Sequence, residues 1–205
     1  MEKQKIGLIC DEGGDLPKDI VEKHQIGIVP FKVDLGEMKD IPGNIYQKIR
    51  EAEKRGIKSF IKTSQPSPGD FLLAFKEKLK RPSTRAKLGA GPVPHRNEVS
   101  GAGFEELICI TITSKHSGTY NSAIQAKNFL EENLKNKVEI IDSLNGSTGE
   151  GLLVLKAISL IKKGLKIKEI SENLKKAISK THLIFMLQDP KWLEASGRLS
   201  HILAS

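Results

Sequence analysis

Two hydroxyl-rich stretches of the sequence carry the residue types best suited to binding a small ligand. The first reads T-S-Q-P-S-P-G-D over residues 63–70, and the second reads T-S-K-H-S-G-T-Y over residues 113–120. Each follows a short apolar run typical of a strand, at residues 57–62 and 107–112, and each precedes a helical pattern. Hydroxyl groups beside the free N–H groups of a helix N-terminus favour the binding of a small anion.

The rest of the chain alternates strand-like and helix-like patterns. The strands are predicted at residues 6–10, 25–31, 57–62, 107–112, 138–141 and 182–187, and the helices at 45–55, 68–80, 119–133, 152–163 and 167–178, with a further helix opening at 15–17. This alternation predicts an α/β fold with a mostly parallel sheet and helices on both faces. In such a sheet, loops at the carboxyl ends of the strands lie together and bind ligands.

Composition limits the classes of function. The chain has 205 residues, 38% of them hydrophobic, which is enough for one substantial core. Its net charge is +8, but lysines interleave with glutamates and only 5% of residues are aromatic, which disfavours nucleic-acid binding. No apolar run is long enough for a membrane span and no secretory segment is visible, so a cytoplasmic protein is expected. Cys10 and Cys109 lie within strand patterns and are expected to be reduced core thiols rather than metal ligands.

The sequence gives no sign of catalytic machinery. It lacks the phosphate loop G-x-x-x-x-G-K-[ST], the zinc motif H-E-x-x-H and the nucleophile elbow G-x-S-x-G. Ser117 has no identifiable His/Asp relay in the sequence. We therefore expect a binding protein with no catalytic residue, no metal and no cofactor.

Some of the loop hydroxyls have a purely structural interpretation. Ser67 and Asp70 have the spacing of a helix N-cap with its capping-box acid. This leaves Thr63 and Ser64, which precede the cap, available to a ligand. Ser117 would cap the next helix, yet a capping hydroxyl still has a proton to donate outward.

Further capping patterns occur elsewhere in the chain. Asp15 is positioned to cap the first helix, and Ser147 and Glu150 form the capping-box pattern S-x-x-E. The glycines between residues 146 and 151 indicate close helix–sheet packing, or alternatively the wall of a ligand site.

Taken together, the stretches T-S-Q-P-S-P-G-D-F and I-T-S-K-x-S-G-T-Y-x-S-A resemble the two signature loops of the DegV family of bacterial fatty-acid-binding proteins. The resemblance implies that Thr63 and Ser117 donate hydrogen bonds to a fatty-acid carboxylate, with Ser64, Ser114 and Gly118 as further ligand-binding candidates. It also implies that a separate, ATP-binding fatty-acid kinase subunit phosphorylates the bound long-chain fatty acid for phospholipid synthesis. This chain would then present the substrate and catalyse nothing itself.

Other parts of the chain follow the family pattern less closely. Residues 142–151 resemble its D-S-x-x-x-S-x-G-x-G stretch, whereas C-D-E-G-G-D-L-P at 10–17 replaces the family's T-D-S-x-x-D-L-P. The carboxylate of Glu12 would oppose an anionic ligand if it faced inward. Arg198, within the G-R-L-S stretch, is a candidate for a head-group or partner contact.

The resemblance also suggests a division of the chain. Family members continue into a second α/β domain, so we expect residues 1–188 to form the lipid-binding domain. Residues 81–103, rich in Gly, Pro and basic residues, would be a flexible insertion, and residues 189–205 a linker and the start of a truncated second domain.

Two alternatives stay open. An α/β protein could bind a phosphorylated small molecule or nucleotide at the same loops, although the first loop has no Lys or Arg and the second has only Lys115. The chain could also be a degraded copy of the family with no ligand. If the second domain is absent, we expect weak acyl binding, or pairing with another chain that covers the exposed apolar surface.

Overall fold

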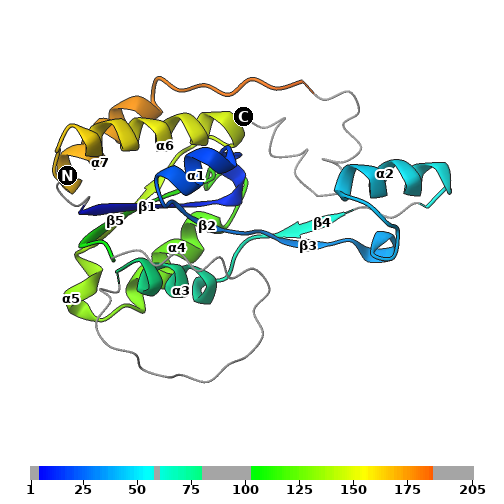
Figure 1. Cartoon of the computed structure of the whole chain (residues 1–205), viewed down its shortest axis with the longest axis horizontal. Helices are drawn as coiled ribbons and strands as arrows, with labels where there is room; N and C mark the ends of the chain where they lie inside the picture. Colours follow the sequence, from blue (N-terminus) through cyan, green and yellow to red (C-terminus); the bar gives the residue numbers. More distant parts are fainter. Residues whose placement is uncertain (1–4, 58–60, 80–102, 187–205) are drawn as a thin grey trace.

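A computed structural model describes residues 5–57, 61–79 and 103–186 of the chain (Figure 1). In chain order the elements are β1 (Ile6–Asp11), η1 (Glu12–Gly14), α1 (Lys18–Lys23), β2 (Gly27–Val29), β3 (Lys32–Asp34), η2 (Gly36–Met38), α2 (Ile45–Lys54), β4 (Lys62–Ser64), α3 (Pro68–Leu79), β5 (Glu106–Thr111), α4 (Thr119–Asn128), α5 (Glu132–Lys135), β6 (Val138–Asp142), α6 (Ser147–Lys162) and α7 (Ile167–Ile178). None of these helices is long and apolar enough to cross a membrane.

The main sheet has four strands in the order β2-β1-β5-β6, and every pair in it is parallel. Ile9 of β1 lies opposite Gly27 on one side and Cys109 on the other. Every residue of β1 is buried. This is the expected result for an inner strand of a parallel sheet, because helices cover both of its faces.

The two faces of the sheet carry separate hydrophobic cores, because neighbouring residues of a strand point in opposite directions. One core combines Leu8, Cys10, Ile108 and Ile110 with residues of α1, α6 and α7. The other combines Ile9, Leu107 and Cys109 with Phe71 and Phe75 of α3 and Ala123 and Ala126 of α4. Figure 1 shows α6 and α7 on one side of the sheet and α3, α4 and α5 on the other. The predicted α/β architecture is confirmed.

The two cysteines are free, buried and on opposite faces of the sheet. Burial raises the pKa of both thiols well above the usual value, and nearby carboxylates add to the effect. Both are therefore protonated core residues, as expected from the sequence.

A small antiparallel ribbon of β3 and β4 stands apart from the main sheet, with Val33 opposite Thr63 and Lys32 opposite Ser64. The strand predicted at residues 57–62 is therefore misplaced: β4 begins only at Lys62, and residues 58–60 lie outside the described part of the chain. The cause is tertiary. Ile57 and Ile61 pack against a third apolar cluster formed by Met38, Ile41 and Ala52, instead of joining the sheet.

The N-caps predicted for α1 and α6 are wrong. Asp15 adopts a left-handed backbone conformation with φ of 46°, and α1 begins only after Pro17. The carboxylate of Asp15 is engaged elsewhere, because it accepts a hydrogen bond of 2.6 Å from the hydroxyl of Ser147. That contact also removes Ser147 from the expected capping box, and Gly146 occupies the N-cap of α6.

Two further elements differ from the prediction, a helix that is divided and a strand that is absent. The helix expected over residues 119–133 is divided into α4 and α5, because Glu131 has an extended backbone. The strand expected at residues 182–187 is absent from residues 182–186. Ile184 and Met186 are 92% and 94% exposed. Among the described residues no strand pairs with this segment, and a strand requires such a neighbour.

Three expectations concern residues that lie outside the described part of the chain. They are the insertion, except for its last residue Gly103, the domain boundary at 188/189, and the head-group or partner role of Arg198.

Candidate functional site

The first hydroxyl-rich loop leaves the β3–β4 ribbon and enters α3. Thr63 and Ser64 are the last residues of β4, and both are exposed. We expected them at the carboxyl end of a strand of the parallel sheet, and this is wrong, because among the described residues β4 pairs with β3 alone. The loop nevertheless approaches the main sheet, since α3 packs against its face through Phe71 and Phe75.

The second hydroxyl-rich loop follows β5 and leads into α4, as predicted. Ser114 is exposed, whereas Ser117 and Gly118 are half-buried. The N-cap residue of α4 is Gly118 and not Ser117, which we had expected to cap this helix. Ser117 and Gly118 therefore lie beside the free N–H groups of a helix that starts at the carboxyl end of a central strand.

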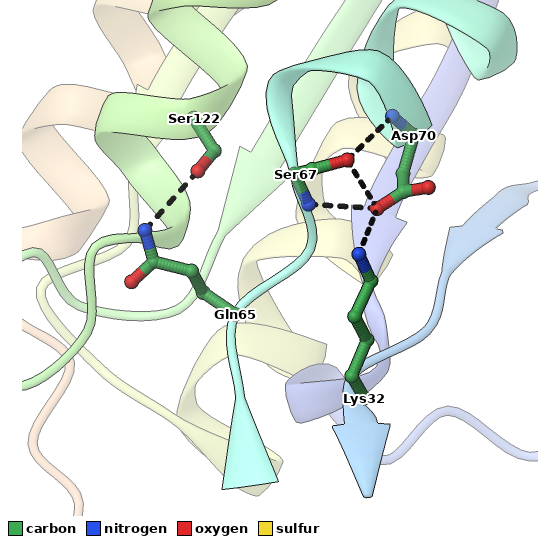
Figure 2. Close-up of polar contacts among 5 residues, drawn as sticks. All are labelled: Lys32, Gln65, Ser67, Asp70 and Ser122. Atoms are coloured by element: carbon green, nitrogen blue, oxygen red, sulfur yellow. Dashed lines mark hydrogen bonds and ion pairs between the residues drawn. The ribbon is translucent and has the colours of Figure 1, made fainter.

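The two loops meet through the side chain of Gln65. Its Nε2 donates a hydrogen bond of 3.3 Å to the hydroxyl of Ser122, in the first turns of α4 and 57 residues further along the chain. The same amide lies against Gly118, where an added Cβ would come within 2.5 Å of Nε2 and closer still to Oε1. Figure 2 shows Gln65 reaching from its loop toward Ser122. Both signature loops are thus brought to one place in the fold.

Ser67 and Asp70 form a complete capping box at the start of α3, as predicted. The Ser67 hydroxyl accepts from the Asp70 N–H at 3.3 Å, and the Asp70 carboxylate accepts from the Ser67 N–H at 2.7 Å and from its hydroxyl at 2.6 Å. These contacts lower the pKa of Asp70, chiefly through the Ser67 hydroxyl. Ser67 is thus committed to helix capping.

Lys32 brings a cation to the first loop, and no local pattern of the sequence indicated this contact. Its Nζ lies 3.5 Å from the Asp70 carboxylate (Figure 2). As a residue of β3, Lys32 lies opposite Ser64 of β4. The first loop itself contains no basic residue, so this charge comes from a neighbouring strand.

Ser117 has a partner within its own loop. Its hydroxyl lies 2.8 Å from that of Thr119, which is fully buried, and it also accepts from the Thr119 N–H at 3.3 Å. An oxygen in this position accepts from the helix start and keeps its proton for Thr119 or for a ligand. Thr119 is therefore a residue that orients Ser117, and the S-G-T sequence alone did not single it out.

Asp142, at the end of β6, connects the second loop to the third. Its Oδ1 accepts from the N–H of Ser114 and from that of Leu144, each at 3.1 Å. The side chain of Ser114 is exposed beside this contact.

The first βα loop carries two carboxylates with different environments. Asp11 is fully buried and accepts hydrogen bonds from the N–H groups of Gly13 and Ile112. Burial raises the pKa of Asp11 to about 6, although the two hydrogen bonds oppose the shift. Glu12 is exposed, and its carboxylate accepts from the Phe31 N–H at 3.1 Å.

Glu150 has an unusual environment that the capping pattern concealed. It is fully buried in the first turn of α6, and neither carboxylate oxygen has a hydrogen-bond partner among the described residues. Burial, together with the negative charges of Asp11, Asp15 and Asp142, raises the pKa of Glu150 to about 10. Glu150 is therefore a neutral carboxylic acid at pH 7.

The described residues contain no group of three or more His, Cys, Asp or Glu side chains placed to hold a metal ion. What the loops offer is a set of neutral hydroxyl and amide donors at helix N-termini, a chemistry suited to a small anion.

Comparison with known families identifies the protein's relatives. A family model described as "Uncharacterised protein, DegV family" matches residues 5–85 and 96–205, which is most of the chain. The chain belongs to the DegV family. The ten residues that the model passes over, 86–95, fall within the segment expected from the sequence to be an insertion.

Among its relatives is a DegV domain-containing protein of Clostridium acetobutylicum, 32% identical over 202 residues, an alignment that covers 96% of this chain and 62% of the relative. A DegV domain-containing protein of Caldanaerobacter subterraneus is covered to 61% of its length. The chain thus spans about three fifths of the length of these two curated relatives.

Solved structures of the family share the fold. DegV, a fatty acid binding protein from Bacillus subtilis, superposes with a TM-score of 0.72 at 24% identity, covering 98% of this chain and 64% of its own. A DegV family protein from Thermus thermophilus, described for its fatty acid binding, gives a TM-score of 0.69 at 26% identity and covers 95% of this chain and 61% of its own.

Proposed function

We propose that this DegV chain binds a long-chain fatty acid by its carboxylate, with Thr63 and Ser117 as the principal hydrogen-bond donors. Ser64, Ser114 and Gly118 would complete the surroundings of the head group. The observation that carries the proposal is the contact of Gln65 with Gly118 and Ser122, because it brings the two hydroxyl-rich loops to one place. Fatty-acid binding by the Bacillus and Thermus relatives supports the same ligand class.

The chemistry of the loops fits a carboxylate. Hydroxyl groups donate to an anion without bringing a buried charge, and the start of α4 adds free N–H groups and a partial positive charge. Each methylene of the acyl tail that leaves water would add roughly 0.8 kcal/mol to the binding free energy. The tail would then favour a long-chain acid over a short one, since both carry the same carboxylate.

We further propose that the chain presents the bound acid to a separate ATP-binding fatty-acid kinase subunit and does not itself transfer phosphate. The sequence has no G-x-x-x-x-G-K-[ST] loop to hold ATP phosphates. The chain alone, incubated with ATP and palmitic acid, should form no acyl phosphate, and addition of a kinase subunit should start the reaction. Acyl phosphate formed by the chain alone would contradict the presenting role.

The proposed ligand is tested by mass spectrometry of an organic extract of the purified protein, beside a Thr63→Ala/Ser117→Ala double variant. We expect a long-chain fatty acid in the wild-type extract and its loss from the variant, with thermal unfolding confirming that the variant is folded. A folded wild-type chain without lipid, which also gains thermal stability from inorganic phosphate, would instead support a phosphorylated ligand at the same loops.

A further inference from the structure

The Gln65 amide occupies a position that only a glycine neighbour permits. It lies where the Cβ of any other residue at position 118 would be. Its Nε2 donates to the hydroxyl of Ser122, a residue of α4 that is only 3% exposed. Gln65 itself is exposed. An exposed amide ordinarily samples many rotamers, so its placement on Gly118 restricts the loop that carries it.

This contact matters because the residues on either side of Gln65 are held very differently. Thr63 and Ser64 belong to a three-residue exposed strand that is paired with β3 in a ribbon outside the main sheet. By contrast, Ser122 belongs to α4 and Gly118 is its N-cap residue, and Ala123 and Ala126 of this helix are fully buried against the main sheet. Gln65 therefore ties the weakly held loop directly to the rigid helix (Figure 2).

We propose that Gln65, seated on Gly118 and hydrogen-bonded to Ser122, is a positioning residue that sets the spacing of the two hydroxyl-rich loops and thereby selects ligands with a carboxylate head group. The inference rests on the proposed function. If Gln65 fixes where Thr63 lies relative to Ser117, its loss weakens the recognition of the head group and leaves the binding of the tail unchanged. A merely structural residue would affect both.

Paired ligands separate these two effects. We would measure the affinities of palmitic acid and of hexadecanol, which has the same tail and no carboxylate, for the wild-type chain and for Gln65→Ala. We expect Gln65→Ala to lose about tenfold in affinity for the acid, the scale of one hydrogen-bonding contribution, and to change less than about twofold for the alcohol. Gln125→Ala, at an exposed glutamine of α4, is the matched control and should change neither affinity.

Gly118→Ala tests the same contact from the other side. The φ of Gly118 is −79°, which alanine adopts freely, and the three atoms nearest to the added methyl all belong to the end of the flexible Gln65 side chain. The variant should therefore fold and displace the amide from Ser122. If Gly118→Ala lowers the affinity only by displacing Gln65, the double variant Gln65→Ala/Gly118→Ala loses no more affinity for palmitic acid than Gln65→Ala alone.

Hydrogen–deuterium exchange gives a readout without ligand. The amides of residues 62–65, in the weakly held loop, should exchange faster in Gln65→Ala than in the wild-type chain or in Gln125→Ala. Equal acid affinity in wild type and Gln65→Ala, or an equal loss for acid and alcohol, would overturn the positioning role while leaving the proposed function intact. A wild-type chain that binds neither ligand would overturn the proposed function, and the positioning role with it.

Discussion

The carboxylate of Asp11 accepts a hydrogen bond from the backbone N–H of Ile112, with 2.7 Å between Oδ2 and N. Its other oxygen accepts from the Gly13 N–H at 2.8 Å. Asp11 thus ties the end of β1 to the residue that follows β5, where the second hydroxyl-rich loop begins.

Replacing Asp11 by alanine should therefore destabilise the fold, because two partly buried N–H groups lose their acceptor. We expect Asp11→Ala to lower the free energy of unfolding by about 1–3 kcal/mol, measured by urea denaturation. Asp40→Ala, at an exposed turn residue, should stay within about 0.5 kcal/mol of wild type. An unchanged urea midpoint for Asp11→Ala would show that these hydrogen bonds add nothing to stability.

Glu150 predicts a pH-dependent loss of stability. Its pKa is about 10 in the folded chain against an ordinary value of 4.5, so the folded state keeps a proton that the unfolded state releases. The stability should fall as pH rises through this window, with a slope of at most about 1.4 kcal/mol per pH unit. Glu150→Gln removes the slope, because an amide cannot ionise, and should be more stable than wild type at neutral pH.

The test of Glu150 is best made between about pH 7 and pH 8.5. Asp11, with a pKa of about 6, is already mostly ionised there, and the thiols of Cys10 and Cys109, whose ordinary value is 9.0, are still mostly protonated in the unfolded chain. The difference in free energy of unfolding between Glu150→Gln and wild type, measured by urea denaturation, should grow across this range. Glu172→Gln, at an exposed residue of α7, should have the same pH dependence as wild type. A constant difference would contradict the burial of a neutral acid.

The sequence predicted the main sheet well because its strands are apolar on both faces and alternate with helices. It misplaced β4 because Ile57 and Ile61 have the same local pattern as strand residues, and only the tertiary structure sends them to the cluster around Met38. It identified the two loops, but not the tie between Gln65 and Ser122, since a contact across 57 residues leaves no local pattern.

The same limit explains the misinterpretation of the third loop. S-x-x-E is a local capping pattern, and it predicted that Ser147 and Glu150 form a capping box at the start of this helix. In the fold, Ser147 instead donates to Asp15, and Glu150 is buried without a partner among the described residues. Long-range contacts therefore outweighed local pattern at this helix start, whereas at α3 the local capping box persisted.

Gly151 should not tolerate a side chain. A Cβ added there would lie 2.8 Å from the backbone carbonyl oxygen of Gly14, which cannot swing aside as a flexible side chain would. We expect Gly151→Ala to destabilise the chain by about 1–3 kcal/mol, because α6 or the η1 turn must shift. Gly69→Ala is the matched control in α3: its Cβ would meet only the Ser67 hydroxyl at 3.6 Å, so the substitution should be neutral or slightly stabilising. Equal melting temperatures for the two variants would contradict the close packing of α6.

The capping box of Ser67 and Asp70 should contribute stability that disappears in acid. Ser67→Ala removes the hydroxyl that bonds Asp70 twice, and we expect a loss of about 0.5–2 kcal/mol near neutral pH, with Ser159→Ala on the exposed face of α6 as the control. The pKa of Asp70 is lowered in the folded chain, first of all by the Ser67 hydroxyl, so this stability is present above the ordinary value of 3.8 and is lost as pH falls through the lower folded value. The free energies of unfolding of wild type and Ser67→Ala, measured by urea denaturation, should therefore become equal in acid. A gap of constant size down to about pH 3 would mean that the hydroxyl acts on the helix backbone and not through the charge of Asp70.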